Sequence, residues 1–146
     1  MTAVLPPLHP KRERALFELY ADVSGRPLGE GMGYLRDLVI ADTDDEARAI
    51  WHQSCAFVGS SWFAPFGFNK GMTDPDDGSA IDADAMMALG LVLVGSVDTV
   101  RRQLDAMRAR LPVNWLFAWM YNGVITNSTL MSTIERFGHA VVRLPG

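Results

Sequence analysis

Hydrophobic and polar residues alternate along the chain in two patterns, short apolar runs and longer stretches with helical spacing. The apolar segments at residues 34–41, 91–94 and 115–120 predict strands. Largely unbroken apolar runs are typical of parallel strands that are covered on both faces. Residues 3–5 predict a short further strand that ends before Pro6 and Pro7, because proline cannot donate to a strand ladder.

Between these segments, apolar residues recur every three or four positions, which predicts helices near residues 11–24, 43–58, 82–89, 97–111 and 126–141. Thr43 and Glu46 form a capping box, and Gly25 suits a helix C-terminus. Thr126 or Asn127 caps the last helix. The residues predicted to form its buried face are Leu130, Met131, Ile134, Phe137 and Val141.

Strands that alternate with helices predict a parallel sheet with right-handed crossovers, and hence an α/β fold in a single domain over residues 1–146. Residues 59–80 break the pattern with a long aromatic segment, too long for a passive linker. Together with the short helix that follows it, we interpret residues 59–90 as a lid loop region.

Composition narrows the class of protein. Of the 146 residues, 49% are hydrophobic and 21% are charged, which is typical of a soluble globular domain. The net charge of -4 gives no electrostatic reason to expect a nucleic acid or an anionic membrane surface as partner. The single cysteine, Cys55, excludes an intrachain disulfide, and the sequence shows no secretion signal, membrane span or metal-ligand spacing. We therefore expect a cytoplasmic protein that handles a small-molecule substrate.

Three segments resemble the luciferase-like family of flavin-dependent monooxygenases. Residues 91–107 are similar to the family's strand and Val-Gly-Thr/Ser-Pro-Glu-x-Val helix start, with Val97 where proline is usual. Residues 114–142 resemble its closing strand, Asn-Gly turn and last helix, and residues 35–51 resemble the strand and helix before them. Residues 67–71 also resemble part of the mobile loop of bacterial luciferase.

The resemblance implies a partial (β/α)8 TIM barrel, of which this chain would supply about the last three to four βα units. A complete barrel needs about 250 residues. The implied activity is oxidation of a small organic substrate with reduced FMN and O2, or with the deazaflavin F420 in place of FMN. The chain would be a fragment or split subunit that lacks much of the flavin site.

Candidate site residues follow from the rule that active groups of such barrels lie where strands end. Tyr121 ends the last strand, where some family members place an active-site tyrosine, and its hydroxyl could hydrogen-bond substrate or flavin. A tyrosine that caps the barrel core is an equal alternative. In the lid, Lys70 could meet a flavin phosphate or an anionic substrate, or be a solvated loop lysine. Trp62, Phe68 and Asn69 complete the substrate and lid set.

Arg36 and Asp37 are polar residues within a predicted strand. Oxygenases of the family that the chain resembles carry polar active-site residues on this strand, which is one interpretation. We prefer a structural salt bridge at the floor of the barrel, because polar groups inside a barrel need partners.

The alternative to an enzyme is a non-catalytic half-barrel that associates with itself or supports a partner chain. Four strands cannot close a barrel, so their edges and apolar faces stay open unless another chain covers them. Under both hypotheses we expect a homo-oligomer or a partner that supplies the N-terminal half-barrel.

Overall fold

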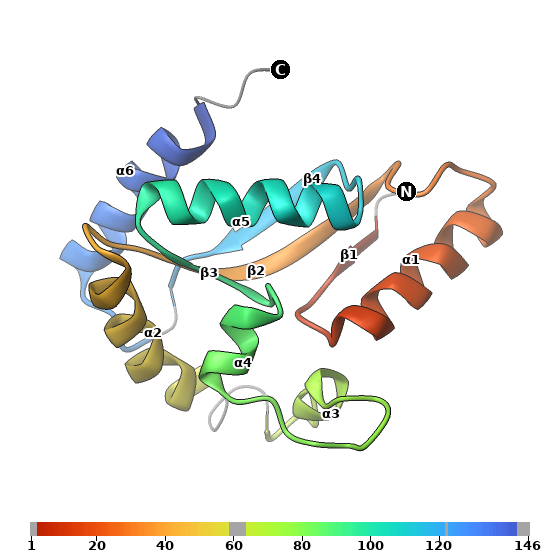
Figure 1. The fold of residues 1–146 in the computed structure, drawn as a ribbon, viewed down its shortest axis with the longest axis horizontal. Coiled ribbons are helices and arrows are strands. Elements are labelled where there is room, and N and C mark those ends of the chain that lie inside the picture. Colours follow the sequence, from red (N-terminus) through yellow and green to blue (C-terminus); the bar gives the residue numbers. More distant parts are fainter. Residues whose placement is uncertain (1–2, 59–63, 122, 143–146) are drawn as a thin grey trace.

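The computed structural model describes residues 3–58, 64–121 and 123–142, which form four strands and six helices (Figure 1). The element order is β1 (Ala3–Leu5), α1 (Pro10–Ser24), β2 (Met32–Ile40), α2 (Asp44–Val58), α3 (Asn69–Met72), α4 (Ala83–Ala88), β3 (Val92–Gly95), α5 (Val97–Arg110), β4 (Trp115–Trp119) and α6 (Asn127–Val142). Each strand is followed by at least one helix as the sequence predicts, and the short helix α3 lies within the segment predicted to be a loop. No helix in the described ranges combines the length and the hydrophobicity needed to cross a bilayer.

All strand pairs in the described sheet are parallel, and β2 is their common neighbour. β1 pairs with Met32–Tyr34 at the start of β2, and β3 pairs with Asp37–Ile40 at its end. β4 pairs with Gly33–Asp37 and so shares β2 residues with both. Because a strand has two edges, β4 lies along one edge of β2, and β1 and β3 lie along the other.

This strand order explains why helices cover both faces of the sheet. The chain moves across the sheet in one direction from β1 to β2 and from β3 to β4, but in the opposite direction from β2 to β3. Right-handed crossovers place the connecting helices on opposite faces when the direction reverses. Accordingly, α1, α5 and α6 pack on one face around Phe17, Tyr34 and Leu104, whereas α2 and α4 pack on the other around Trp51 and Met86.

The fold confirms a parallel α/β sheet that is consistent with part of a barrel, and this sheet is not closed. It also differs from a segment of a regular ring, in which each strand would pair with the next one along the chain. β4 lies beside β2 instead of β3.

Local signals in the sequence account for several helix ends. The Glu46 amide donates to Thr43 Oγ1 at 3.2 Å, as expected of a capping box. The Glu46 carboxylate accepts from the Asp42 amide at 3.2 Å, one residue before the donor that the motif expects. Gly25 ends α1 in the left-handed conformation with φ of 66°, which costs glycine little. Thr126 caps α6, because its hydroxyl accepts the Thr129 amide at 3.2 Å.

The buried face of α6 differs from the prediction. Thr133 and Ala140 are buried and Phe137 is partly buried, whereas Met131, Ile134 and Val141 are exposed by 62%, 46% and 36%. The small side chains face the sheet, and Thr133 Oγ1 donates to the carbonyl of Ile40 at 3.4 Å. Close approach of the helix backbone to β2 therefore replaces burial of the larger side chains.

Candidate functional site

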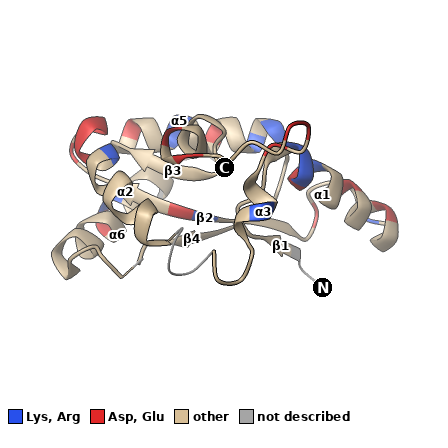
Figure 2. Cartoon of the chain, turned by 90° about the horizontal axis from the view of Figure 1, so that it is seen from below, with Lys and Arg blue, Asp and Glu red and all other residues tan. Residues whose placement is uncertain are grey.

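The four strands carry two charged residues between them, Arg36 and Asp37, which are adjacent in β2 (Figure 2). Successive side chains of a strand point to opposite faces of the sheet. Arg36 faces the layer of α1 and α5, and Asp37 faces the other side.

Arg36 forms a buried ion pair with Glu13 of α1, and neither side chain is exposed to solvent. Its guanidinium also donates to the carbonyls of Gly90 and Leu35, at 3.1 and 2.9 Å, and lies 4.2 Å from the ring centroid of Tyr34. Burial raises the pKa of the Glu13 carboxyl, and the charge of Arg36 opposes that rise. The interpretation of a structural salt bridge therefore holds for Arg36 and is wrong for Asp37, which takes no part in it.

Asp37 lines a pocket of about 340 Å³ on the opposite face of the sheet. The described residues that line it are Pro6, Pro7, Leu8, Leu35, Asp37, Val58, Phe68, Gly71, Met72 and Trp119. They come from the segment after β1, from β2, from the end of α2, from the α3 region and from the last residue of β4. The pocket thus lies toward the carboxyl ends of the strands, where α/β proteins bind ligands.

The pairing of β2 with β4 explains the shape of this wall. Leu35 is paired with Phe117 and Asp37 with Trp119, and partners in a parallel ladder point their side chains to the same face. Trp119 is 36% exposed, Phe117 57% and Trp115 60%. An open row of aromatic side chains therefore leads along β4 toward the pocket.

Asp37 is 5% exposed, and it is the one ionisable side chain among the described residues of the pocket wall. Burial raises the pKa of its carboxyl from 3.8 to about 6, because the charged form loses its hydration. Its own backbone amide and the charge of Arg36 oppose that rise only in part. A carboxyl with a pKa near neutrality can both accept and release a proton under physiological conditions.

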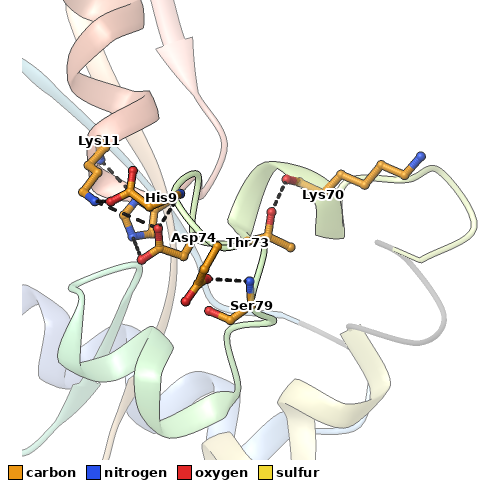
Figure 3. A network of polar contacts seen from close by, with 8 residues as sticks. His9, Lys11, Lys70, Thr73, Asp74 and Ser79 are labelled. Carbon is orange, nitrogen blue, oxygen red and sulfur yellow. Dashed lines mark hydrogen bonds and ion pairs between the residues drawn. The ribbon is translucent and has the colours of Figure 1, made fainter.

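Polar contacts between the start of α1 and the segment after α3 hold the two walls of the pocket together (Figure 3). The His9 amide donates to the carbonyl of Gly71 at 3.1 Å, and His9 Nε2 lies 3.6 Å from an Asp74 carboxylate oxygen. Lys11 contacts Asp74 and Asp76. These contacts place Leu8 against Gly71, where a Cβ atom would lie 2.6 Å from Leu8 Cδ2.

The predicted lid residues are divided between two pockets. Phe68 lines the Asp37 pocket, whereas Asn69 and Lys70 line a second pocket of about 260 Å³ beside Trp51 and Cys55. All three are exposed, and the Lys70 side chain extends away from the His9–Asp74 contacts (Figure 3). Trp62 lies outside the described residues.

Tyr121 follows the end of β4 as predicted, and its side chain is 56% exposed. It is two residues beyond Trp119, whose indole N–H donates to the Tyr121 backbone carbonyl. The Asp37 pocket is lined by Trp119 and does not include Tyr121. A catalytic role for Tyr121 stays a prediction.

Sequence reasoning missed Trp119 as a pocket residue and preferred a structural salt bridge to an active-site role for Asp37. The signal that could have found Asp37 is an acidic residue within an otherwise apolar strand, one position out of phase with Arg36. The surroundings of Asp37 depend on which residues of β2 face the pocket. The register between β2 and β4 determines this, and that register is a tertiary feature. Across residues 3–58, 64–121 and 123–142, no group of three or more His, Cys, Asp or Glu side chains is arranged to hold a metal ion.

No family model and no curated protein matches the sequence. Among solved structures, monooxygenase RslO1 from Streptomyces bottropensis is similar over 97% of this chain, with a TM-score of 0.72 and 17% identity. The oxygenating constituent of 3,6-diketocamphane monooxygenase from the CAM plasmid of Pseudomonas putida is similar over 94% of the chain, with a TM-score of 0.60 and 19% identity. That protein is a type II Baeyer-Villiger monooxygenase, solved in complex with FMN.

At such low identity the likeness concerns the fold. This chain covers 41% and 40% of the two solved chains, and so spans about two fifths of their length. The chain therefore has the fold of part of two monooxygenases, one of which binds FMN.

Proposed function

We propose that this chain is part of a flavin-dependent monooxygenase of the luciferase-like family, in which it contributes a wall of the substrate pocket. The observation that carries the proposal is the apolar pocket at the carboxyl ends of parallel strands, with the buried carboxyl of Asp37 in its wall. Pockets of this kind, with a few polar groups in an apolar lining, are typical of small-molecule sites. The fold likeness to two monooxygenases supports the reaction class.

The described residues fit some parts of a flavin better than others. The apolar walls suit a flat ring or a small organic substrate, but Asp37 would repel a phosphate. Lys70, in the wall of the second pocket, is the cation nearest in sequence to the lid residue Phe68 and is our candidate for a phosphate contact. The remainder of a flavin site would come from a chain that completes the barrel.

A bound reduced flavin, either FMN or F420 in this proposal, would supply the electrons for oxidation by O2. The residues of this chain would hold and shield the substrate. Leu8, Leu35 and Trp119 would contact its apolar body, and Phe68 would limit access of water from the lid side. Asp37 would hold or move a proton at its carboxylate oxygens, and Tyr121 would donate a hydrogen bond at the end of β4.

The proposal includes association with a second chain, either another copy or a chain that supplies the N-terminal half-barrel. The support is the open sheet and the exposed row of Trp115, Phe117 and Trp119. Contiguous exposed apolar surface of this kind usually marks an interaction site.

Flavin binding tests this function. The purified chain, by itself and together with the product of the reading frame just upstream, is titrated into FMN and F420 while flavin fluorescence is followed. We expect quenching that is strongest when the completing chain is present. Absence of binding to either flavin with every partner would contradict the flavin proposal and favour the alternative, a non-catalytic half-barrel that supports a partner chain.

The Lys70 contact is tested in the same titration with FMN and with riboflavin, which lacks the phosphate. Lys70→Met is expected to weaken FMN binding by about tenfold and to leave riboflavin binding unchanged, as for loss of one charged hydrogen bond. Arg108→Met, an exposed cation of α5, is the matched control. Equal losses for the two flavins would exclude a phosphate contact at Lys70.

A further inference from the structure

The Asp37 pocket combines apolar walls with one buried carboxyl. Nine of its ten described lining residues are apolar or glycine, and the tenth is Asp37, which is 5% exposed. The hydrogen-bond donor that this carboxyl has within the described part of the chain is its own backbone amide. A buried carboxylate usually has several donors or a cationic partner, so this one has unused capacity to accept hydrogen bonds.

Neither Arg36 nor Lys70 forms an ion pair with Asp37 in the described part of the chain. Arg36 points to the opposite face of the sheet, where it binds Glu13 and two backbone carbonyls. Lys70 lines the second pocket and is not among the described residues that line the Asp37 pocket. From α2, the titratable group that senses Asp37 is Cys55, whose thiol pKa is raised by burial and secondarily by Asp37. β3 and β4 face Asp37 with Val92 and Trp119, which carry no charge.

A ligand is therefore the natural source of the missing donor. A protonated amine offers a positive charge and up to three N–H donors, whereas an alcohol offers one neutral donor. An anionic ligand would lie against a carboxylate in surroundings that screen charge poorly. The walls formed by Leu8, Leu35, Met72 and Trp119 require that the rest of the ligand be apolar.

We propose that the Asp37 pocket selects apolar molecules that carry a protonated amine, with the ammonium bound at the Asp37 carboxylate and the apolar body against Trp119 and Leu35. This proposal rests on the proposed function in one respect: the amine would be the class of substrate that the same pocket takes. The amine site itself is a property of this chain and needs no flavin.

Three probes of similar size and different charge test the selectivity on the full chain: benzylamine, benzyl alcohol and benzoate. Binding is measured at pH 7.5 by quenching of tryptophan fluorescence and by ligand-observed NMR. We expect benzylamine to bind about tenfold or more tightly than benzyl alcohol, which corresponds to one charge-assisted hydrogen bond. Benzoate is expected to bind most weakly. Equal affinity for the three probes, or no binding of any of them, would overturn the proposal.

Two variants assign the selectivity to Asp37. Asp37→Asn keeps the shape of the side chain and removes its charge, and Asp37→Leu replaces it with an apolar group of similar size. Both are expected to lose the preference for benzylamine while they keep binding benzyl alcohol. Asp105→Asn removes a charge from the exposed face of α5 and should behave as the native chain. A preference for benzylamine that persists in Asp37→Leu would place the amine elsewhere and refute the proposal.

Flavin titrations on the same samples separate the two hypotheses. Amine selectivity without flavin binding would support the site and contradict the monooxygenase proposal. Flavin binding without amine selectivity would leave the monooxygenase proposal standing and reject this substrate class.

Discussion

At the scale of single residues, Arg36 and Asp37 have opposite surroundings although they are neighbours in sequence. Arg36 is fully buried and compensated by Glu13, whereas Asp37 is buried in an apolar wall with little compensation. A buried ion pair contributes little to the free energy of unfolding when both partners are present. Removal of one partner leaves an unpaired buried charge, which is strongly destabilising. An uncompensated carboxyl instead shifts its pKa upward. Removal of Glu13 and titration of Asp37 therefore test the two sites separately.

Asp37 should make the chain less stable as pH rises. The unfolded chain releases the Asp37 proton near pH 3.8, and the folded chain keeps it to about pH 6, so the folded state binds more protons between these values. The free energy of unfolding should then fall by about 2 kcal/mol from pH 4 to pH 7 on account of this residue, out of about 3 kcal/mol over the whole transition. Urea unfolding across this pH range measures the free energy of unfolding. In Asp37→Asn, the decrease that is due to the carboxyl should be missing. Parallel curves for Asp37→Asn and the native chain would show that the carboxyl titrates normally.

Loss of Glu13 should destabilise the fold strongly. Glu13→Leu leaves the fully buried Arg36 without its partner, and the free energy of unfolding should fall by about 3–5 kcal/mol. Replacing Glu13 and Arg36 together with leucine should recover part of that loss, because Arg110, which lies 3.5 Å from Glu13, still loses its partner. Glu18→Leu breaks the exposed pair with Arg14 and should cost less than about 1 kcal/mol. Chemical denaturation of the native chain and the three variants checks this order of stability. Similar losses in the free energy of unfolding for Glu13→Leu and Glu18→Leu would contradict it.

At the scale of elements, the contact of β2 with β4 depends on a glycine. A Cβ atom at Gly33 would lie 2.8 Å from Trp115 Cβ and 2.9 Å from the Trp115 carbonyl oxygen, so β4 has to move to admit alanine. This contact lies in the strand pair that forms the pocket wall. The element arrangement and the pocket are therefore linked through one close approach of two backbones.

Two glycine substitutions separate this steric effect from backbone entropy. Gly33→Ala is expected to lower the free energy of unfolding by about 1–3 kcal/mol through overpacking. Gly138→Ala lies in α6 with no atom within 4 Å of the added methyl, and should raise it by about 0.5–1 kcal/mol. Thermal unfolding of both variants measures whether each substitution lowers or raises the free energy of unfolding. A stabilised Gly33→Ala would mean that β4 is not held against β2 as described.

Local signals made the helices and strands other than α3 predictable from the sequence. The capping box at Thr43, the glycine at position 25 and the apolar run of β3 each act over a few residues. The strand order, the helix face of α6 and the surroundings of Asp37 were not predictable in this way. Each depends on which distant segment lies beside it: β4 beside β2, Thr133 against Ile40, and Trp119 next to Asp37.

The same distinction applies to the candidate site. Phe68, Asn69 and Lys70 were candidates because an aromatic loop interrupts a regular pattern, and they line pockets in the structure, while their roles stay predictions. Their division between two pockets depends on how α3 is held by His9 and Asp74, which no local signal encodes.

At the scale of the whole molecule, the open sheet should lead to association. Trp115, Phe117 and Trp119 form an exposed aromatic row, and we expect a mass in solution above that of one chain, or co-purification with a completing chain. Phe117→Ser should weaken this association. Leu19→Ser, which alters an equally exposed side chain on α1, should have no effect. Light scattering at several concentrations checks this, and a single chain at every concentration would contradict the expectation.

The parallel strands, and the position of β4 at the outer edge of the described sheet, also restrict the symmetry of any homodimer. A twofold axis perpendicular to the sheet would join β4 to its copy in antiparallel fashion and extend one flat sheet across both chains. A twofold axis along the strands would keep every strand parallel and bring β4 of each copy to the β1 and β3 side of the other. Of these two symmetries, only the second turns the two aromatic rows toward a shared interior. Spin labels on β4 distinguish the two dimers, because the labels would be close together in the first and well separated in the second.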